Sequence, residues 1–108
     1  MADSRKILKE LKKSLQNALG DLILEVILFG SYSKNTESKF SDLDVLVITK
    51  TVFNWKEKNL VRGICYNFSV DNDILIDSKI ISQQEIDQEY WGKHPLITDA
   101  LKTGVYAD

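Results

Sequence analysis

Apolar residues recur at helical spacing in the first twenty positions of the chain. One face of the predicted helix collects Ile7, Leu8, Leu11, Leu15, Ala18 and Leu19. Gly20 follows as a typical stop signal, so residues 4–19 are predicted to form an amphipathic helix. Its other face is basic, but Glu10 interrupts it, which favours a solvent-exposed surface over a nucleic-acid patch.

Two apolar runs follow this helix, Leu22–Phe29 and Asp42–Thr49, separated by a polar connection that begins at Gly30. Each has the length of a strand. The second is apolar at both alternating sets of positions after Asp44, which is typical of a central strand covered on both faces.

The rest of the chain predicts a helix, a strand, two short helices and a short edge strand. The first helix spans 54–69, the strand 74–81, the two short helices 82–90 and 96–103, and the edge strand Val105–Tyr106. Asn54 with Glu57, and Ser82 with Glu85, form capping boxes at the starts of the first two helices. Cys65 lies on the apolar face of the first of these helices and is expected to be core. Trp55 is expected to pack between helix and sheet, and His94 to lie at the surface.

Bulk composition narrows the class of protein. The 108 residues predict one domain spanning 1–108, and 44% hydrophobic with 28% charged residues is ordinary for a soluble globular protein. A net charge of −2 gives no general attraction to long nucleic acid or to membranes. A single cysteine fits a reducing cytoplasm. No apolar run is long enough for a transmembrane helix, and the charged amphipathic N-terminus does not resemble a signal peptide.

Asp42 and Asp44 form the first candidate for chemistry. Residues two apart in a strand share a face, so their Cα atoms lie roughly 6.6 Å apart with both carboxylates on one side. Like charges this close repel, and hard oxygen ligands suit Mg²⁺, so the pair favours a metal site. The alternative is a polar strand start in which Asp44 faces solvent.

Gly30 and Ser31 form the second candidate. A glycine directly after a buried strand allows a tight turn and close approach of a ligand. Successive backbone N–H groups and the Ser31 hydroxyl can then hold phosphate oxygens. Ser-Asp-x-Asp and an apolar strand follow Gly30-Ser31 eleven residues later. This spacing would bring the phosphate-binding loop and the metal ligands to one edge of a sheet.

These residues resemble the signature of the DNA polymerase β-like nucleotidyltransferase superfamily, in particular its minimal nucleotidyltransferase domains. The resemblance runs from Leu22 to about Ser82, and more loosely to the C-terminus. It implies an α+β, mixed α/β fold in which helices pack mainly on one face of a mixed sheet and the active site lies at the sheet edge. The family commonly has Arg-Gly where this chain has Lys34-Asn35; Lys keeps the charge, and Asn tolerates a positive φ.

The resemblance also implies roles for individual residues. Asp42 and Asp44 would bind both of two Mg²⁺ ions, and Asp77 the ion nearer the acceptor hydroxyl. Gly30 and Ser31 would hold the β and γ phosphates of ATP, and Lys34 would help to neutralise them.

Asp73 competes with Asp77 for the third acidic position, because both lie on one face of the predicted strand by parity. Asp73 directly follows a turn, where acids are common. Asp77 stands between Ile76 and the Ile80-Ile81 pair, deeper in the predicted sheet, where burial of an unpaired carboxylate would be costly. This comparison favours Asp77.

Two functions from different classes follow. The first is Mg²⁺-dependent transfer of AMP from ATP to a hydroxyl; the resemblance suggests a tyrosine of a HEPN-type toxin partner as acceptor. The second is a non-catalytic, antitoxin-like module that masks a partner protein, which the Lys34-Asn35 departure favours slightly and the intact acidic triad disfavours.

Overall fold

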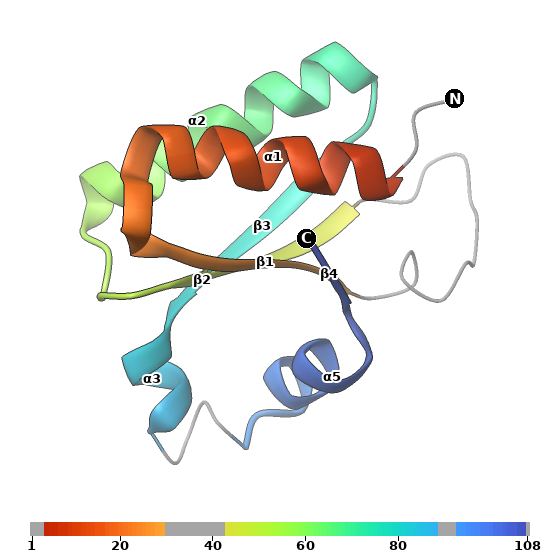
Figure 1. Cartoon of the computed structure of the whole chain (residues 1–108). Coiled ribbons are helices and arrows are strands. Elements are labelled where there is room, and N and C mark those ends of the chain that lie inside the picture. The colour runs from red at the N-terminus through yellow and green to blue at the C-terminus, as the bar shows by residue number, and fades with distance from the viewer. Residues whose placement is uncertain (1–3, 30–42, 89–92, 108) are drawn as a thin grey trace.

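The computed structural model describes residues 4–29, 43–88 and 93–107. Within these ranges a four-stranded sheet of order β3-β2-β1-β4 carries helices on both faces (Figure 1). The strands are β1 (Ile23–Phe29), β2 (Leu43–Thr49), β3 (Ile76–Ser82) and β4 (Val105–Tyr106). The helices are α1 (Ser4–Leu19), a 3-10 turn η1 (Gly20–Leu22), α2 (Trp55–Asn72), α3 (Gln83–Asp87) and α5 (Pro95–Thr103).

The sheet is mixed. β1 pairs antiparallel with both β2 and β4, whereas β2 pairs parallel with β3. A parallel pair needs a long crossover, and α2 supplies it between β2 and β3. The predicted mixed α/β class is therefore confirmed, with β3 as an edge strand.

The two long helices, α1 and α2, cover one face of the sheet (Figure 1). Their apolar stripes meet alternate residues of β1 and β2 in a core that includes Leu11, Leu15, Val26, Val45, Val47, Val61 and Cys65. Lys12 joins this face to the C-terminal segment, because its Nζ lies 3.3 Å from Glu25 and donates to the Ala107 carbonyl at 3.0 Å.

The short helices α3 and α5 lie on the opposite face (Figure 1). Here the other set of alternating residues forms a smaller cluster of Ile27, Leu46, Ile48, Ile81, Ile97 and Ala100. β2 is thus covered on both sides, as its doubly apolar sequence predicts.

Element boundaries agree with the sequence to within a few residues. α1 has the predicted bounds, and the capping boxes at Asn54 and Ser82 are both present. α2 continues to Asn72, with Asp73 as a left-handed cap at φ 52°, so β3 begins at Ile76 instead of Ile74. The prediction for Trp55 is wrong: its side chain is 69% exposed, with the Lys56 ammonium 5.7 Å from the ring centroid.

Cys65 is buried, as predicted. In the part of the chain that the structure describes, no helix combines the length and apolar character needed to cross a membrane.

Candidate functional site

Two of the predicted site residues lie side by side. Asp44 is the second residue of β2 and Asp77 the second residue of β3, and they are direct partners in the parallel register. Neighbouring strands are about 4.8 Å apart, and register partners direct their side chains to the same face. The fold therefore brings together two carboxylates that are 33 positions apart in sequence.

Alternation decides which face of the sheet they share. Leu43, Val45 and Val47 belong to the core under α1 and α2, so Asp44 lies on the face of α3 and α5 with Leu46. Its side chain is half-buried.

The sequence argument that Asp77 lies deep in the sheet is wrong. Asp77 is exposed, because β3 is an edge strand and Asp77 stands near its start. Among the described residues, its carboxylate has no hydrogen bond or ion pair. Its place beside Asp44, not burial, is what distinguishes it.

Asp73 is separated from the pair. It caps α2 at φ 52° and lies outside β3, so the two acids do not share a strand face. The backbone conformation accounts for an acid here, since Asp and Asn tolerate the left-handed region better than most residues.

The other predicted site residues, Gly30, Ser31, Lys34 and Asp42, lie outside the described residues. The strands that flank them are described, however. Phe29, the last residue of β1, is the register partner of Asp44. β1 therefore ends beside Asp44, and Gly30 is the next residue in the sequence.

The donor set at this edge fits a divalent cation. Two carboxylates on adjacent strands offer hard oxygen ligands, the type that Mg²⁺ prefers. No group of three or more potential ligand side chains gathers within the ranges 4–29, 43–88 and 93–107. The third carboxylate predicted for this site is Asp42, one residue before the start of β2.

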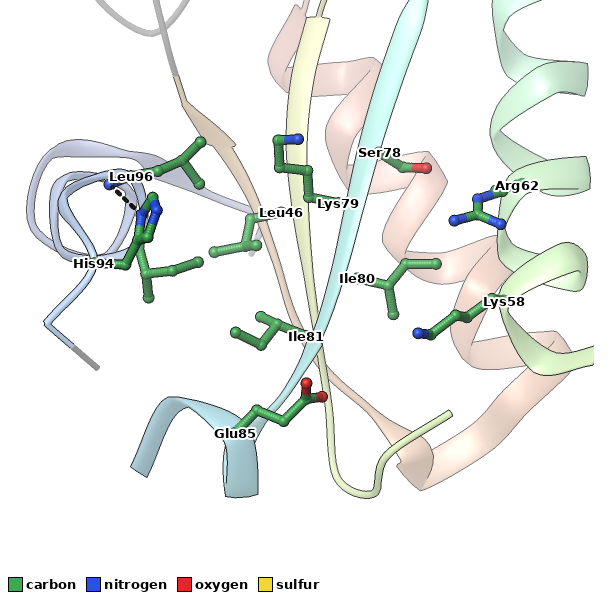
Figure 2. A pocket seen from close by; sticks show the side chains of 11 residues that line it. Leu46, Lys58, Arg62, Ser78, Lys79, Ile80, Ile81, Glu85, His94 and Leu96 are labelled. Carbon is green, nitrogen blue, oxygen red and sulfur yellow. Dashed lines mark hydrogen bonds between the residues drawn. The ribbon is translucent and has the colours of Figure 1, made fainter. Parts of the chain in front are cut away.

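A cavity of about 440 Å³ lies along β3, where Ser78, Lys79, Ile80 and Ile81 line it (Figure 2). Lys58 and Arg62 of α2 border it on one side of the strand, and Lys79 and His94 on the other. The bordering acid, Glu85, already accepts hydrogen bonds from the Ser82 backbone and hydroxyl at 3.1 and 3.0 Å. The cavity is therefore basic.

Sequence reasoning missed these cations as a group. Two signals were present: Lys58 and Arg62 stand one helical turn apart, and Lys79 stands two residues after Asp77 on the same strand face. The sequence alone did not reveal that β3 is the edge strand. Because it is, the cations of α2 and Lys79 of β3 border the same cavity.

Cysteine and histidine often take part in catalysis, but Cys65 and His94 have structural roles here. Burial raises the pKa of the Cys65 thiol from its ordinary 9.0 to about 11, against a smaller lowering by a hydrogen bond with Ser78. A protonated, buried thiol is a poor nucleophile. His94 caps α5, where its Nδ1 accepts the Leu96 N–H at 3.2 Å.

Comparison with known proteins places the chain in context. The family described as "Nucleotidyltransferase domain" matches residues 4–101. Among curated proteins, "Putative protein adenylyltransferase MJ0141" of Methanocaldococcus jannaschii is 39% identical over 78% of this chain and 84% of its own length. Two further proteins of that organism with the same description, MJ1305 and MJ0604, are 28% and 29% identical over 75% and 72% of this chain, and 60% and 83% of their own lengths.

Two solved structures share the fold. One is a crystal structure of a mutant of the toxin-antitoxin MntA-HpeT, with a TM-score of 0.59 at 13% identity. The other is a crystal structure of a toxin-antitoxin with AMP-PNP, with a TM-score of 0.60 at 15% identity. Each alignment covers 93% of this chain and 72% of the other, and at these identities the likeness shows the fold alone.

Proposed function

The chain belongs to the nucleotidyltransferase domain family, and from that premise we propose that it transfers AMP from ATP to a hydroxyl group on a partner protein. The observation that carries the proposal is the Asp44–Asp77 register pair, and β1 ends at Phe29, the register partner of Asp44. In the proposed site Gly30 and Ser31, which follow Phe29 in the sequence, would bind phosphate next to these acids, as nucleotidyl transfer requires.

In the proposed reaction the acceptor hydroxyl oxygen attacks the α-phosphorus of ATP. The bond between that phosphorus and the oxygen bridging to the β-phosphorus breaks, and pyrophosphate leaves. A carboxylate oxygen of Asp77 takes the hydroxyl proton. Ser31 and the Gly30 backbone would donate hydrogen bonds to the β and γ phosphates, with Lys34 offsetting their charge.

Two Mg²⁺ ions complete the proposed site. Asp42 and Asp44 would hold both ions, and Asp77 the one nearer the acceptor. When bound, the ions would lower the pKa of the entering hydroxyl and neutralise the departing pyrophosphate. Asp44 and Asp77 suit this role because adjacent strands hold them in fixed register.

Two findings favour a protein acceptor. The relative that is 39% identical is described as a protein adenylyltransferase, and one structural neighbour is a toxin-antitoxin with AMP-PNP. We therefore propose a tyrosine of a HEPN-type toxin as the acceptor, with this chain as its antitoxin.

Incubation with Mg²⁺ and ATP labelled at the α-phosphorus tests the proposal. The acceptor sources are cell lysate and the product of the neighbouring gene. We expect label on a protein band, and mass spectrometry should place AMP on a hydroxyl side chain. ATP labelled at the γ-phosphorus is the matched control, because nucleotidyl transfer leaves that label on pyrophosphate.

The Asp44→Asn variant keeps the size of the side chain and removes its charge, so we expect loss of label transfer. A tight complex with the neighbouring gene product, without transfer of label from any preparation, would favour the masking module. Transfer of the γ label would contradict nucleotidyl transfer and indicate a phosphoryl transferase.

A further inference from the structure

On the outer edge of β3, the backbone N–H groups at the two ends of the strand have hydrogen-bond partners, whereas the backbone groups in the middle have none among the described residues. The Leu43 N–H donates to the Leu75 carbonyl, which sets the parallel ladder so that Asp77, Lys79 and Ile81 direct backbone groups to β2. The residues between them direct theirs outward. The Ile76 N–H donates to the Ser69 hydroxyl at 3.0 Å, and the Ser82 N–H to Glu85 at 3.1 Å.

Ser78 and Ile80 remain between these two closed ends. Within the described part of the chain, neither has a backbone hydrogen-bond partner on its outward side. Both border the 440 Å³ cavity, so the open groups adjoin a hollow (Figure 2). An edge strand with exposed N–H and C=O groups is a template for one more strand.

Charge determines which strand would fit. Lys58, Arg62 and Lys79 have no ion pair among the described residues, and all three border the open stretch. Pairing with β3 of a second copy would bring these cations together with their own counterparts, which is unfavourable. An incoming strand with acidic side chains would meet opposite charges instead.

The position of Asp77 gives the added strand a function. Asp77 directly precedes Ser78. The residue opposite Asp77 in an added strand would direct its side chain to the face that carries Asp44 and Asp77. The residue two positions further would stand opposite Lys79 on that same face.

We propose that the acceptor segment of the partner protein is an extended acidic stretch that adds to the edge of β3 as a fifth strand, with its hydroxyl residue opposite Asp77. This inference rests on the proposed function and names how its substrate is recognised. Backbone hydrogen bonds to Ser78 and Ile80 supply affinity, and the cations select acidic side chains.

The test uses the fluorescent peptide Glu-Val-Glu-Glu-Tyr-Glu-Glu-Val-Glu and the full chain without ATP, because alternation then presents glutamates both to Lys79 and to Lys58 and Arg62 on the other side of β3. The peptide is palindromic, so parallel and antiparallel addition present the same side chains. We expect saturable binding by fluorescence anisotropy. Absence of binding at millimolar peptide, or equal binding of the peptide with Lys in place of every Glu, would overturn the proposal.

Backbone methylation separates strand addition from attraction between charges. One peptide isomer carries N-methyl groups on the residues at positions 4 and 6, which flank the tyrosine, and the other carries them on positions 3 and 7. In an added strand only one set of N–H groups faces β3, so one isomer should bind and the other should not. Equal affinity of the two isomers would overturn strand addition.

Lys79→Glu tests the assigned edge. We expect it to weaken peptide binding by about tenfold, since a cation opposite a glutamate becomes an anion. Lys13→Glu on the outer face of α1 makes the same charge change far from β3 and should alter affinity by less than about twofold. Equal weakening by both variants would show that net charge alone governs binding.

The failure of this inference can be told from that of the proposed function. With Mg²⁺ and labelled ATP, label should reach the peptide tyrosine, and moving that tyrosine by one position should abolish labelling. A chain that labels another protein and binds this peptide without labelling it contradicts the acceptor role of the β3 edge. A chain that labels nothing contradicts the proposed function, while the binding results still decide strand addition.

Discussion

Asp77 shows how a residue acquires its role from its neighbour. It is exposed at the start of an edge strand, a place where an acid needs no special explanation by itself. Its register partner is Asp44, so two like charges stand on adjacent strands. Like charges on adjacent strands repel, and a bound cation would relieve that repulsion, which fits the proposed metal site.

We expect Asp77→Asn to lower AMP transfer by about 100-fold or more, because Asp77 is both a metal ligand and the proton acceptor in the proposed reaction. MgATP binding should be largely retained, since in the proposed site Asp42 and Asp44 would still hold the nucleotide-bound ion. Rates at saturating MgATP and calorimetric titrations measure the two effects separately.

Asp73→Asn is the matched control for that substitution. Asp73 caps α2 at φ 52°, a conformation that asparagine adopts readily, so neither rate nor stability should change much. If Asp73→Asn abolished transfer and Asp77→Asn did not, the assignment of the third acid to β3 would be wrong.

Cys65 gives the chain a dependence of stability on alkaline pH. Its folded-state pKa is about 11 against an ordinary 9.0, because burial disfavours the thiolate. The unfolded chain therefore loses this proton first. The contribution to stability is fully present below pH 9 and is lost between pH 9 and 11, by roughly 2 to 3 kcal/mol.

Denaturant unfolding of the wild type and of Cys65→Ala from pH 8 to 11 measures this loss. The variant keeps all other groups that titrate in this range, so the difference between the two pH profiles isolates the thiol. Parallel profiles would show that the thiol is not the source of the pH dependence.

At the scale of elements, close packing constrains the junction of α5 and β4. Gly104 has an ordinary φ of −68°, so backbone conformation does not require glycine there. Space does: a Cβ at this position would overlap the Ala100 carbonyl oxygen and the Ile27 side chain, and would touch the Leu28 carbonyl. Two of these three contacts are backbone atoms, which cannot rotate away.

We expect Gly104→Ala to lower the free energy of unfolding by about 1 to 3 kcal/mol through overpacking. Gly63→Ala is the matched control. Gly63 is an exposed residue of α2, and a Cβ there meets nothing within 4 Å. That variant should be more stable than the wild type by about 0.5 to 1 kcal/mol, since alanine favours the helix. Chemical denaturation of both proteins measures the contrast, and equal effects would contradict the packing account.

Local signals predicted the elements well and their ends less well. Asn54 with Glu57, and Ser82 with Glu85, each mark a helix start through two reciprocal hydrogen bonds, and both boxes are present. The end of α2 was missed because Asp73 provides a left-handed cap, a role that glycine more often fills. Because α2 ends later than predicted, β3 begins at Ile76 instead of Ile74.

At the scale of the whole molecule, strand order could not be derived from hydrophobic pattern. β4 pairs with β1 and not with β3, so β3 remains at the edge of the sheet. The pairing of β4 with β1 joins residues almost 80 positions apart. The acid spacing and the family resemblance predicted one site for Asp42, Asp44 and Asp77; Asp44 and Asp77 are register partners, and Asp42 lies outside the described residues. The basic edge and the exposure of Asp77 depend on strand order, so neither could be predicted from the hydrophobic pattern.

The arrangement of β1 and β2 also predicts how the whole chain responds to nucleotide. β1 ends at Phe29 opposite Asp44, so a triphosphate held by Gly30 and Ser31 would join the end of one strand to the start of the next. Binding to the folded state alone stabilises a protein by about 2.7 kcal/mol at a ligand concentration of 100 times Kd. For a chain of this length we expect Tm to rise by roughly 10 °C.

Thermal melts with Mg²⁺ and α,β-methylene ATP, which cannot transfer AMP, measure this rise. The Gly30→Ala, Ser31→Ala double variant should melt near the wild-type Tm without nucleotide and should lose most of the rise with it. One substitution blocks close backbone approach, and the other removes a hydroxyl donor. A variant that kept the full rise would exclude the Gly30-Ser31 segment from the nucleotide site.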